Sequence, residues 1–298
     1  MLAPTPSAPE PERGSGLSRR LRLTIITVVI IVIVVIGIIG YAVTGLAYAQ
    51  TRVGNANRTL GTVTSRQTSI DSSFRDLSAK FKSLSSNGNF DPQQERTLFE
   101  QFIANETTSA ATDDRDDASL ASARASLGEQ QWLTVLAGSN IDNEAARIDH
   151  ARKALAIAKT AATGYVLVGQ FFVALYDAEL DLQMFSTQIA TADFSGASTT
   201  LTAMKTHVDQ GLQLSTAPSL PTELHLLMGD FETLVGDFGK LLAAAAANDD
   251  TAVVNAENSV QADSSKLGSY NVDAIMAKIG AYYQPMFDQI GSELTKAA

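Results

Sequence analysis

The sequence predicts an all-α protein in which a single N-terminal transmembrane helix is followed by an elongated antiparallel helical bundle, or by two consecutive bundles. Residues 23–51 carry no charge and consist largely of isoleucine and valine. Downstream, apolar residues recur at intervals of three, four and seven, which is the period of amphipathic helices. No window alternates apolar and polar residues between hairpin turns, as strands of an antiparallel sheet would.

The N-terminal region divides into a tail and an apolar segment. Residues 1–22 are rich in proline and lack apolar periodicity, so we expect a disordered tail. Residues 23–49 are expected to form a transmembrane signal-anchor helix in contact with the lipid bilayer, because a helix of this length exceeds the ~30 Å hydrocarbon core. Signal-peptide cores are shorter, at about 7–15 residues. The small-x-small ending Ala47-Tyr48-Ala49 leaves the alternative of cleavage near Ala49 and secretion.

Basic residues predict the orientation of this anchor. Arg19, Arg20 and Arg22 cluster on its N-terminal side, whereas the arginines that follow it are spaced more widely. Positive charge favours the cytoplasmic side, so the N-terminus is expected in the cytoplasm. Residues 50–298 would then be extracytoplasmic, held at the cell membrane by one span.

Composition limits the chemistry and the partners of the chain. There is no cysteine, which excludes disulfides, thiolate metal sites and thiol nucleophiles. The formal net charge is −10, and such a charge repels phosphate groups. We therefore expect no nucleic-acid partner.

Residues 50–137 are predicted to form a membrane-proximal helical region that begins with a coiled-coil-like helix. A second helix is expected over 93–107, a break or charged loop over 108–119, and a third helix to about Ala137. A heptad seam of the first helix indicates shallow packing against partner helices. One line of this seam runs through Ala56, Val63, Ile70, Leu77 and Leu84.

Residues 138–298 are predicted to form the helical bundle. Residues 141–191 read either as one very long helix or as two joined near Gly164, where the heptad phase changes. The apolar run 161–176 is interpreted as a core helix, because its flanking charges oppose the positive-inside pattern. Turn chemistry separates the helices. The predicted breaks are AGSN (137–140), the residues before Asp193, STAPSLP (215–221) and AANDDTA (246–252).

The residues that could act in catalysis or bind a metal ion lie far apart in the sequence. The three histidines, His150, His207 and His225, are too far apart in sequence for a local ligand pair, and no nucleotide-binding or hydrolase motif is present. Asp177 and Asp181 lie on the same face of the predicted helix, and Glu179 lies on a different face. That spacing suits an acid–base pair, but a solvated helix face is the simpler interpretation.

The acidic cluster Asp113, Asp114, Asp116 and Asp117 lacks the glycine and terminal glutamate of a calcium loop, and Arg115 interrupts it. It is interpreted as a solvated helix start. Trp132 is interpreted as a core residue. We therefore expect no catalytic, cofactor-binding or metal-binding residues, no cofactor and no enzymatic activity.

These observations predict a membrane-anchored extracytoplasmic binding or interaction module, sensor-like and non-catalytic, with helix faces for a protein partner or a second copy. The layout of residues 20–90 resembles the first transmembrane helix and helical sensor region of bacterial chemoreceptors and sensor kinases, which implies a sensing role. The alternative is a structural or scaffold subunit of a membrane or cell-envelope complex. A binding module requires a pocket with convergent polar groups, whereas a scaffold requires a contiguous exposed apolar stripe.

Overall fold

The computed structural model of the 298-residue chain describes residues 59, 62–63, 91–129 and 138–297. Most of these residues lie in helices and none lies in a strand, which confirms the predicted all-α helical bundle. The predicted tail, the transmembrane helix 23–49 and Trp132 lie outside the described residues. The helices are α3 (Pro92–Glu129), α4 (Gly138–Ala190), α5 (Phe194–Leu214), α6 (Thr222–Ala247), α7 (Asp250–Leu267) and α8 (Val272–Ala297).

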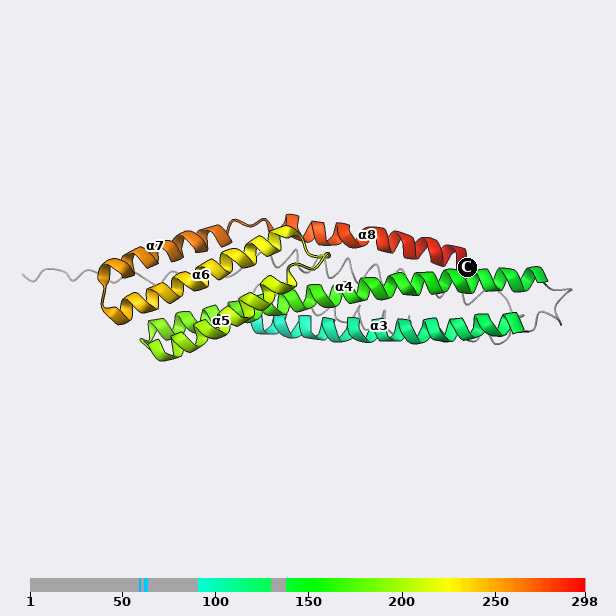
Figure 1. Cartoon of the computed structure of the whole chain (residues 1–298), viewed down its shortest axis with the longest axis horizontal. Helices are drawn as coiled ribbons and strands as arrows, with labels where there is room; N and C mark the ends of the chain where they lie inside the picture. The colour runs from blue at the N-terminus through cyan, green and yellow to red at the C-terminus, as the bar shows by residue number, and fades with distance from the viewer. Residues whose placement is uncertain (1–58, 60–61, 64–90, 130–137, 298) are drawn as a thin grey trace, which may run out of the picture.

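The long helix α4 is the axis of the elongated bundle, and α3, α5 and α8 all pack against it (Figure 1). From the middle of the molecule α6 runs toward one end, α7 returns beside it, and α8 continues toward the opposite end (Figure 1). There the C-terminal end of α8 meets the start of α4, where Arg147 Nε donates to the carbonyl oxygen of Ala297 at 2.8 Å. This path places the α5–α6 loop beside α8 at mid-length.

Helix α3 is continuous through residues 108–119, so the break predicted there is wrong. Asp113 and Asp116 are buried against the rest of the protein, at 2% and 0% exposure. Asp114 accepts from Lys159 at 2.6 Å and Asp117 from Arg152 at 2.7 Å, both on α4. The acidic run therefore lies inside α3, so the prediction of a helix start there is wrong. Two of its aspartates are buried, and the two more exposed ones pair with the neighbouring helix.

The helix stop predicted at residues 137–140 is misplaced, because Gly138 already begins α4 and α3 ends earlier, at Glu129. Residues 141–191 resolve as one helix to Ala190. Gly164 lies inside α4 without interrupting it, and the ring of Tyr283 occupies the space beside it. A Cβ atom at position 164 would lie 2.5 Å from the Tyr283 hydroxyl oxygen, so this glycine permits close approach of α8.

The later turns are confirmed. The Asp193 side chain caps α5 by accepting from the Gly196 N–H at 2.9 Å. Asn248 ends α6 in the left-handed region with φ 52°, and Asp249 caps α7. Side chains of this kind satisfy the free N–H groups of the first helical turn. The loop predicted at 215–221 separates α5 from α6.

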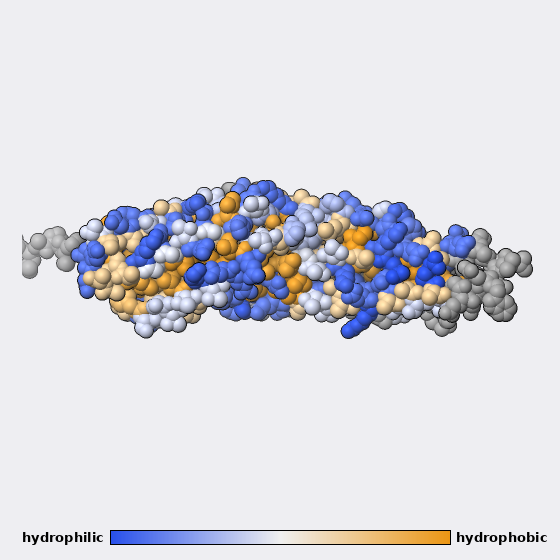
Figure 2. Space-filling model, in the orientation of Figure 1, coloured by the Kyte–Doolittle hydropathy of each residue, from blue (hydrophilic) through white to orange (hydrophobic). Residues whose placement is uncertain are grey.

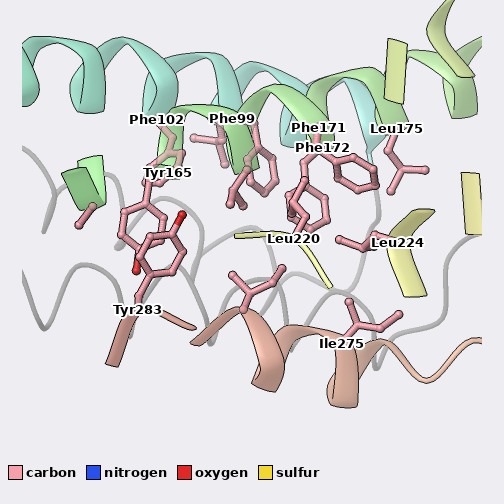
Figure 3. Packing of buried hydrophobic residues seen from close by; sticks show 14 of the residues in the cluster. Phe99, Phe102, Tyr165, Phe171, Phe172, Leu175, Leu220, Leu224, Ile275 and Tyr283 are labelled. Carbon is pink, nitrogen blue, oxygen red and sulfur yellow. The ribbon is translucent and has the colours of Figure 1, made fainter. Parts of the chain in front are cut away.

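An aromatic cluster between α3, α4 and α8 fills the middle of the bundle (Figure 3). The rings of Phe99 and Phe172 stack with centroids 5.0 Å apart, and those of Tyr165 and Tyr283 with centroids 3.9 Å apart. Val63, from the predicted heptad seam, is buried and belongs to the same core. Stacked and edge-on ring pairs of this kind add to the stabilisation from burial.

The apolar run 161–176 contributes buried side chains to this core. Asp142–Ala190 of α4 is the one segment of the described chain that is long and apolar enough to cross a membrane, by length and composition alone. A central helix with neighbours on several sides passes the same test, because much of its surface faces protein. The most apolar window of this segment is 39% buried inside the protein.

Candidate functional site

A hollow of about 220 Å³ opens where the α5–α6 loop meets α8. It lies at the edge of the aromatic core, and Leu220 of the loop points into that core (Figure 3). Its wall therefore combines core residues with solvent-facing ones. The lining residues are Pro218, Ser219, Leu220, Pro221, Thr222 and Glu223 from the loop and α6, with Lys278 and Tyr282 from α8.

Local sequence holds the loop in place at both ends. Ser215 ends α5 and its hydroxyl donates to the Leu212 carbonyl oxygen at 2.6 Å. A turn closes where the Leu220 N–H donates to the Ala217 carbonyl oxygen at 2.9 Å. Pro221 then starts α6 from an extended conformation, with no side-chain cap, which suits a residue that has no N–H to satisfy.

An ion pair spans the hollow. The Lys278 ammonium on α8 donates to the Glu223 carboxylate in the first turn of α6. That hydrogen bond, together with one from the Glu223 backbone, lowers the pKa of the Glu223 carboxyl below its ordinary value. The two formal charges cancel, so the lining carries no net charge at neutral pH.

Two buried hydroxyl groups lie close together near the hollow. Ser219, which lines the hollow, is 4% exposed, and Tyr283, which is not among the lining residues, is 1% exposed. Burial raises the pKa of Tyr283, and a hydrogen bond with the Ser219 hydroxyl opposes that rise. Both hydroxyl oxygens are enclosed by protein, so neither is open to a molecule in the hollow.

An exposed aromatic ring borders the same hollow. Tyr282 is 39% exposed, one of the few large apolar side chains that reach the surface in the described part of the chain. Its ring packs edge-on against Tyr283, with centroids 5.1 Å apart and an interplanar angle of 83°. That contact supports the Tyr282 ring at the rim of the hollow.

The histidines do not come together. His150 Nδ1 lies 2.6 Å from a Glu293 oxygen and links α4 to α8. His207 Nδ1 lies 2.7 Å from an Asp181 oxygen and links α5 to α4. Each of these pairs connects two helices, and the described residues contain no group of three side chains arranged to hold a metal ion.

The acid–base pair considered for Asp177 and Asp181 does not form. The Asp177 carboxylate accepts from Arg96 on α3, whereas Asp181 bonds His207 on α5. Glu179, between them in sequence, is largely buried. The two aspartates therefore serve different helix contacts.

The sequence reasoning missed a serine–histidine contact, in which Ser215 Oγ lies 2.8 Å from His225 Nδ1. The Ser215 hydroxyl proton is already donated to the Leu212 carbonyl oxygen. The His225 Nδ1 must then carry the proton and donate to Ser215, because a hydroxyl has only one hydrogen to give. A base that activates a serine nucleophile accepts the hydroxyl proton, so this contact anchors the loop.

A buried carboxyl, Glu106 on α3, was also missed. It has 0% exposure and neither carboxyl oxygen has a hydrogen-bond partner. Burial, and then the nearby Asp113 charge, raise the pKa of Glu106 well above its ordinary value. Burial is also the main cause of the raised pKa values of Tyr165 and Tyr283. The polar neighbours of Glu106 in the sequence, Asn105 and Thr107, give no signal for burial.

The fold and the hollow together define an elongated all-helical bundle with a small, polar, charge-balanced surface site. No protein-family model matches the chain, and neither a curated protein nor a solved structure matches it.

Proposed function

We propose that this protein is a membrane-anchored extracytoplasmic binding module, sensor-like and non-catalytic, whose ligand site is the hollow between the α5–α6 loop and α8. The observation that carries this proposal is the hollow itself, which brings the exposed Tyr282 ring and the Glu223–Lys278 ion pair together from two different helices. Ligand sites combine apolar walls with a few placed polar groups.

The predicted location rests on the sequence. The uncharged segment 23–49 supports the anchor, and the arginines before it support an extracytoplasmic bundle. The described helices begin well after this segment. A hollow at the side of an elongated domain would remain accessible to solvent when the chain is tethered at its N-terminal end.

The arrangement of lining groups favours binding over catalysis. Ser219 has no base in hydrogen-bond contact, and the Glu223 carboxylate is held by Lys278. Nucleophilic catalysis requires a nucleophile within hydrogen-bond reach of a base. The hollow instead offers donors and acceptors around a small volume.

The exposed apolar side chains favour the binding module over the scaffold alternative. Figure 2 shows the apolar areas of one face separated by hydrophilic residues. Single exposed apolar residues are normal on a protein surface, whereas a binding stripe is contiguous. Among the described residues, the large apolar side chains that are exposed come one from each of five helices. They are Met184, Phe194, Leu226, Val254 and Tyr282.

A blocking variant tests the proposal. Thr222 lines the hollow and is exposed, so Thr222→Trp should fill the hollow while leaving the core intact. Thr251→Trp, at an exposed position of α7, is the matched control. The full chain and both variants would be purified from native membranes into lipid nanodiscs, and retained small molecules identified by mass spectrometry.

We expect at least one small molecule to be retained by the unmodified chain and by Thr251→Trp and to be lost from Thr222→Trp. Identical retention by all three proteins, or retention of nothing by any of them, would overturn the proposal that the hollow is a ligand site.

A further inference from the structure

We infer that Asp237 on α6 and Asp263 on α7 share one proton between their carboxyl groups, which makes the packing of α7 against α6 sensitive to pH. The contact is stabilised in acid and weakened as the pH rises. The inference goes beyond the proposed ligand site and does not depend on it. Three features carry it: the few buried residues of α7, the contact between the two carboxyl groups and the balance of charge around them.

Helix α7 is held by little apolar burial. It packs chiefly against α6 and lies beside it at one end of the molecule (Figure 1). Ala256 is the one buried residue among the described residues of α7, and Val260 and Leu267 pack against the core while partly exposed. Because apolar burial contributes in proportion to its area, the polar contacts between α7 and α6 strongly affect how firmly α7 is docked.

Two acidic side chains meet in this contact. Asp237 is 6% exposed, and its carboxylate accepts from Lys240. The Asp263 carboxyl is in hydrogen-bond contact with that of Asp237, and its Oδ2 atom is buried without a donor from the described part of the chain. An ionised carboxylate only accepts hydrogen bonds, whereas a protonated one has an O–H to donate. A hydrogen bond between the two groups therefore requires a proton on one of them.

The neighbouring cations leave one negative charge in excess. Asp230 on α6 accepts from Lys266 on α7 at 2.7 Å, and Asp237 accepts from Lys240. Lys266 also attracts Asp263, but it is already bound to Asp230. Three carboxyl groups thus face two ammonium groups. A single proton on the Asp237–Asp263 pair removes the excess charge, and Asp263 carries it because Lys240 holds Asp237 ionised.

Other titratable groups near this contact do not replace the pair. The Tyr270 hydroxyl donates to Asp230 at 2.6 Å, and its pKa, raised to about 12 chiefly by burial, keeps it neutral. On the α5 side of α6, Lys205 bonds Asp209 and lies 3.7 Å from Glu232. The histidine of α5 bonds an aspartate of α4. These groups have charged partners of their own, away from Asp263.

The pH dependence has a definite sign. Burial, and then the Asp237 charge, raise the pKa of the Asp263 carboxyl above its ordinary value of 3.8. The stabilisation of the docked helix is therefore fully present below the ordinary pKa and is lost as the pH rises through the raised one. As Asp263 ionises, two like charges meet across the contact and repel each other. Helix α7 is most firmly docked in acid.

The test is hydrogen exchange of the full chain in lipid nanodiscs, measured by mass spectrometry at several pH values from 4 to 7 and corrected for the intrinsic exchange rate at each pH. Amide protection reports the local opening of a helix, and α5 is the internal reference. The protection of α7 relative to α5 should fall as the pH rises. The fall should reach up to about tenfold for each pH unit between the ordinary and the raised pKa of Asp263.

Variants assign the effect to the pair. Asp263→Asn keeps the shape of the protonated side chain and can donate to Asp237 but cannot ionise. It should remove the pH dependence of α7 protection and raise that protection at pH 7. Asp237→Asn should also reduce the dependence, because no second charge then faces Asp263. Glu257→Gln removes the same charge from an exposed position of α7 and should leave the dependence unchanged.

Infrared titration adds a direct measurement of the proton. The spectrum of the unmodified chain should contain a protonated-carboxyl band that persists above pH 4, that remains in Glu257→Gln and that is absent from Asp263→Asn. Circular dichroism establishes that each variant is folded, and if one of the two aspartate variants does not fold, the other decides.

Three results would overturn the inference. The first is α7 protection that does not change with pH in the unmodified chain. The second is a pH dependence that Asp263→Asn or Asp237→Asn retains in full, because another group would then control the contact. The third is an infrared spectrum that Asp263→Asn leaves unchanged, because the two carboxyl groups would then meet without a shared proton.

Discussion

Glutamine at position 106 should stabilise the protein at neutral pH and flatten the pH dependence of its stability. Glu106 is completely buried, and its two oxygens have no hydrogen-bond partner. Burial and Asp113 raise its pKa well above 4.5, the value of an unperturbed glutamate. The folded protein therefore holds this carboxyl protonated at pH values where the unfolded chain has released the proton.

The sign of the effect follows from this difference in bound protons. The contribution of Glu106 is fully present below the unfolded pKa and is lost as pH rises toward the raised folded pKa. Each pH unit in that window lowers the free energy of unfolding by about 1.4 kcal/mol. Glu106→Gln keeps the shape of the protonated side chain and has no proton to release.

The measurement is urea unfolding of the full chain, followed by circular dichroism in a zwitterionic detergent at several pH values from 5 to 8. The free energy of unfolding of Glu106→Gln should exceed that of the unmodified chain at pH 7, and the gap should narrow by about 1.4 kcal/mol for each pH unit within the window as the pH falls toward 5. Glu257→Gln, exposed on α7, is the matched control and should follow the unmodified chain. Parallel curves for Glu106→Gln and the unmodified chain would refute the reasoning, because Glu106 would then be charged in the folded state.

Two further predictions concern contacts of α8. The pKa of Glu293 is lowered to about 2, chiefly by its hydrogen bond from Lys296, so stability present above pH 4.5 should fall as the pH approaches 2. Glu293→Gln should remove part of that fall in acid unfolding followed by circular dichroism, and an unchanged profile would contradict the assignment. Gly164→Ala should lower the free energy of unfolding by about 1–3 kcal/mol, because its Cβ would meet the Tyr283 hydroxyl. Gly229→Ala, where a Cβ meets nothing within 4 Å, should instead raise it by about 0.5–1 kcal/mol in urea titrations; equal effects at both glycines would count against the packing described at α4.

Local patterns predicted the later helices well. Asp193 and Asn248 stand at helix ends as expected, because capping and left-handed turns depend on the residue and its immediate neighbours. Phe231 and Phe238, which stand seven residues apart in the sequence, are both buried in α6, since periodicity alone identifies the apolar face of a helix. The location and orientation of the chain stay predictions that rest on residues before the described helices.

The candidate site was not visible in the sequence. Ser219 belongs to an ordinary-looking loop, and Tyr283 reads as one more apolar position of a terminal helix. The loop that carries Ser219 meets Lys278 only when α8 folds back along α4 (Figure 1). A hydroxyl that looks solvated in sequence becomes a buried group through that packing.

The sequence by itself determined that the chain is helical, where most of its later helices end and which of their faces are apolar, because these properties depend on residues within one or two turns of one another. Only the tertiary structure decided that the acidic run at 113–117 continues α3, since its partners Arg152 and Lys159 lie on another helix. Only the tertiary structure decided the close packing at Gly164, the burial of Glu106 and the position of the hollow. Each depends on contacts between residues far apart in sequence, whose energies no local pattern contains.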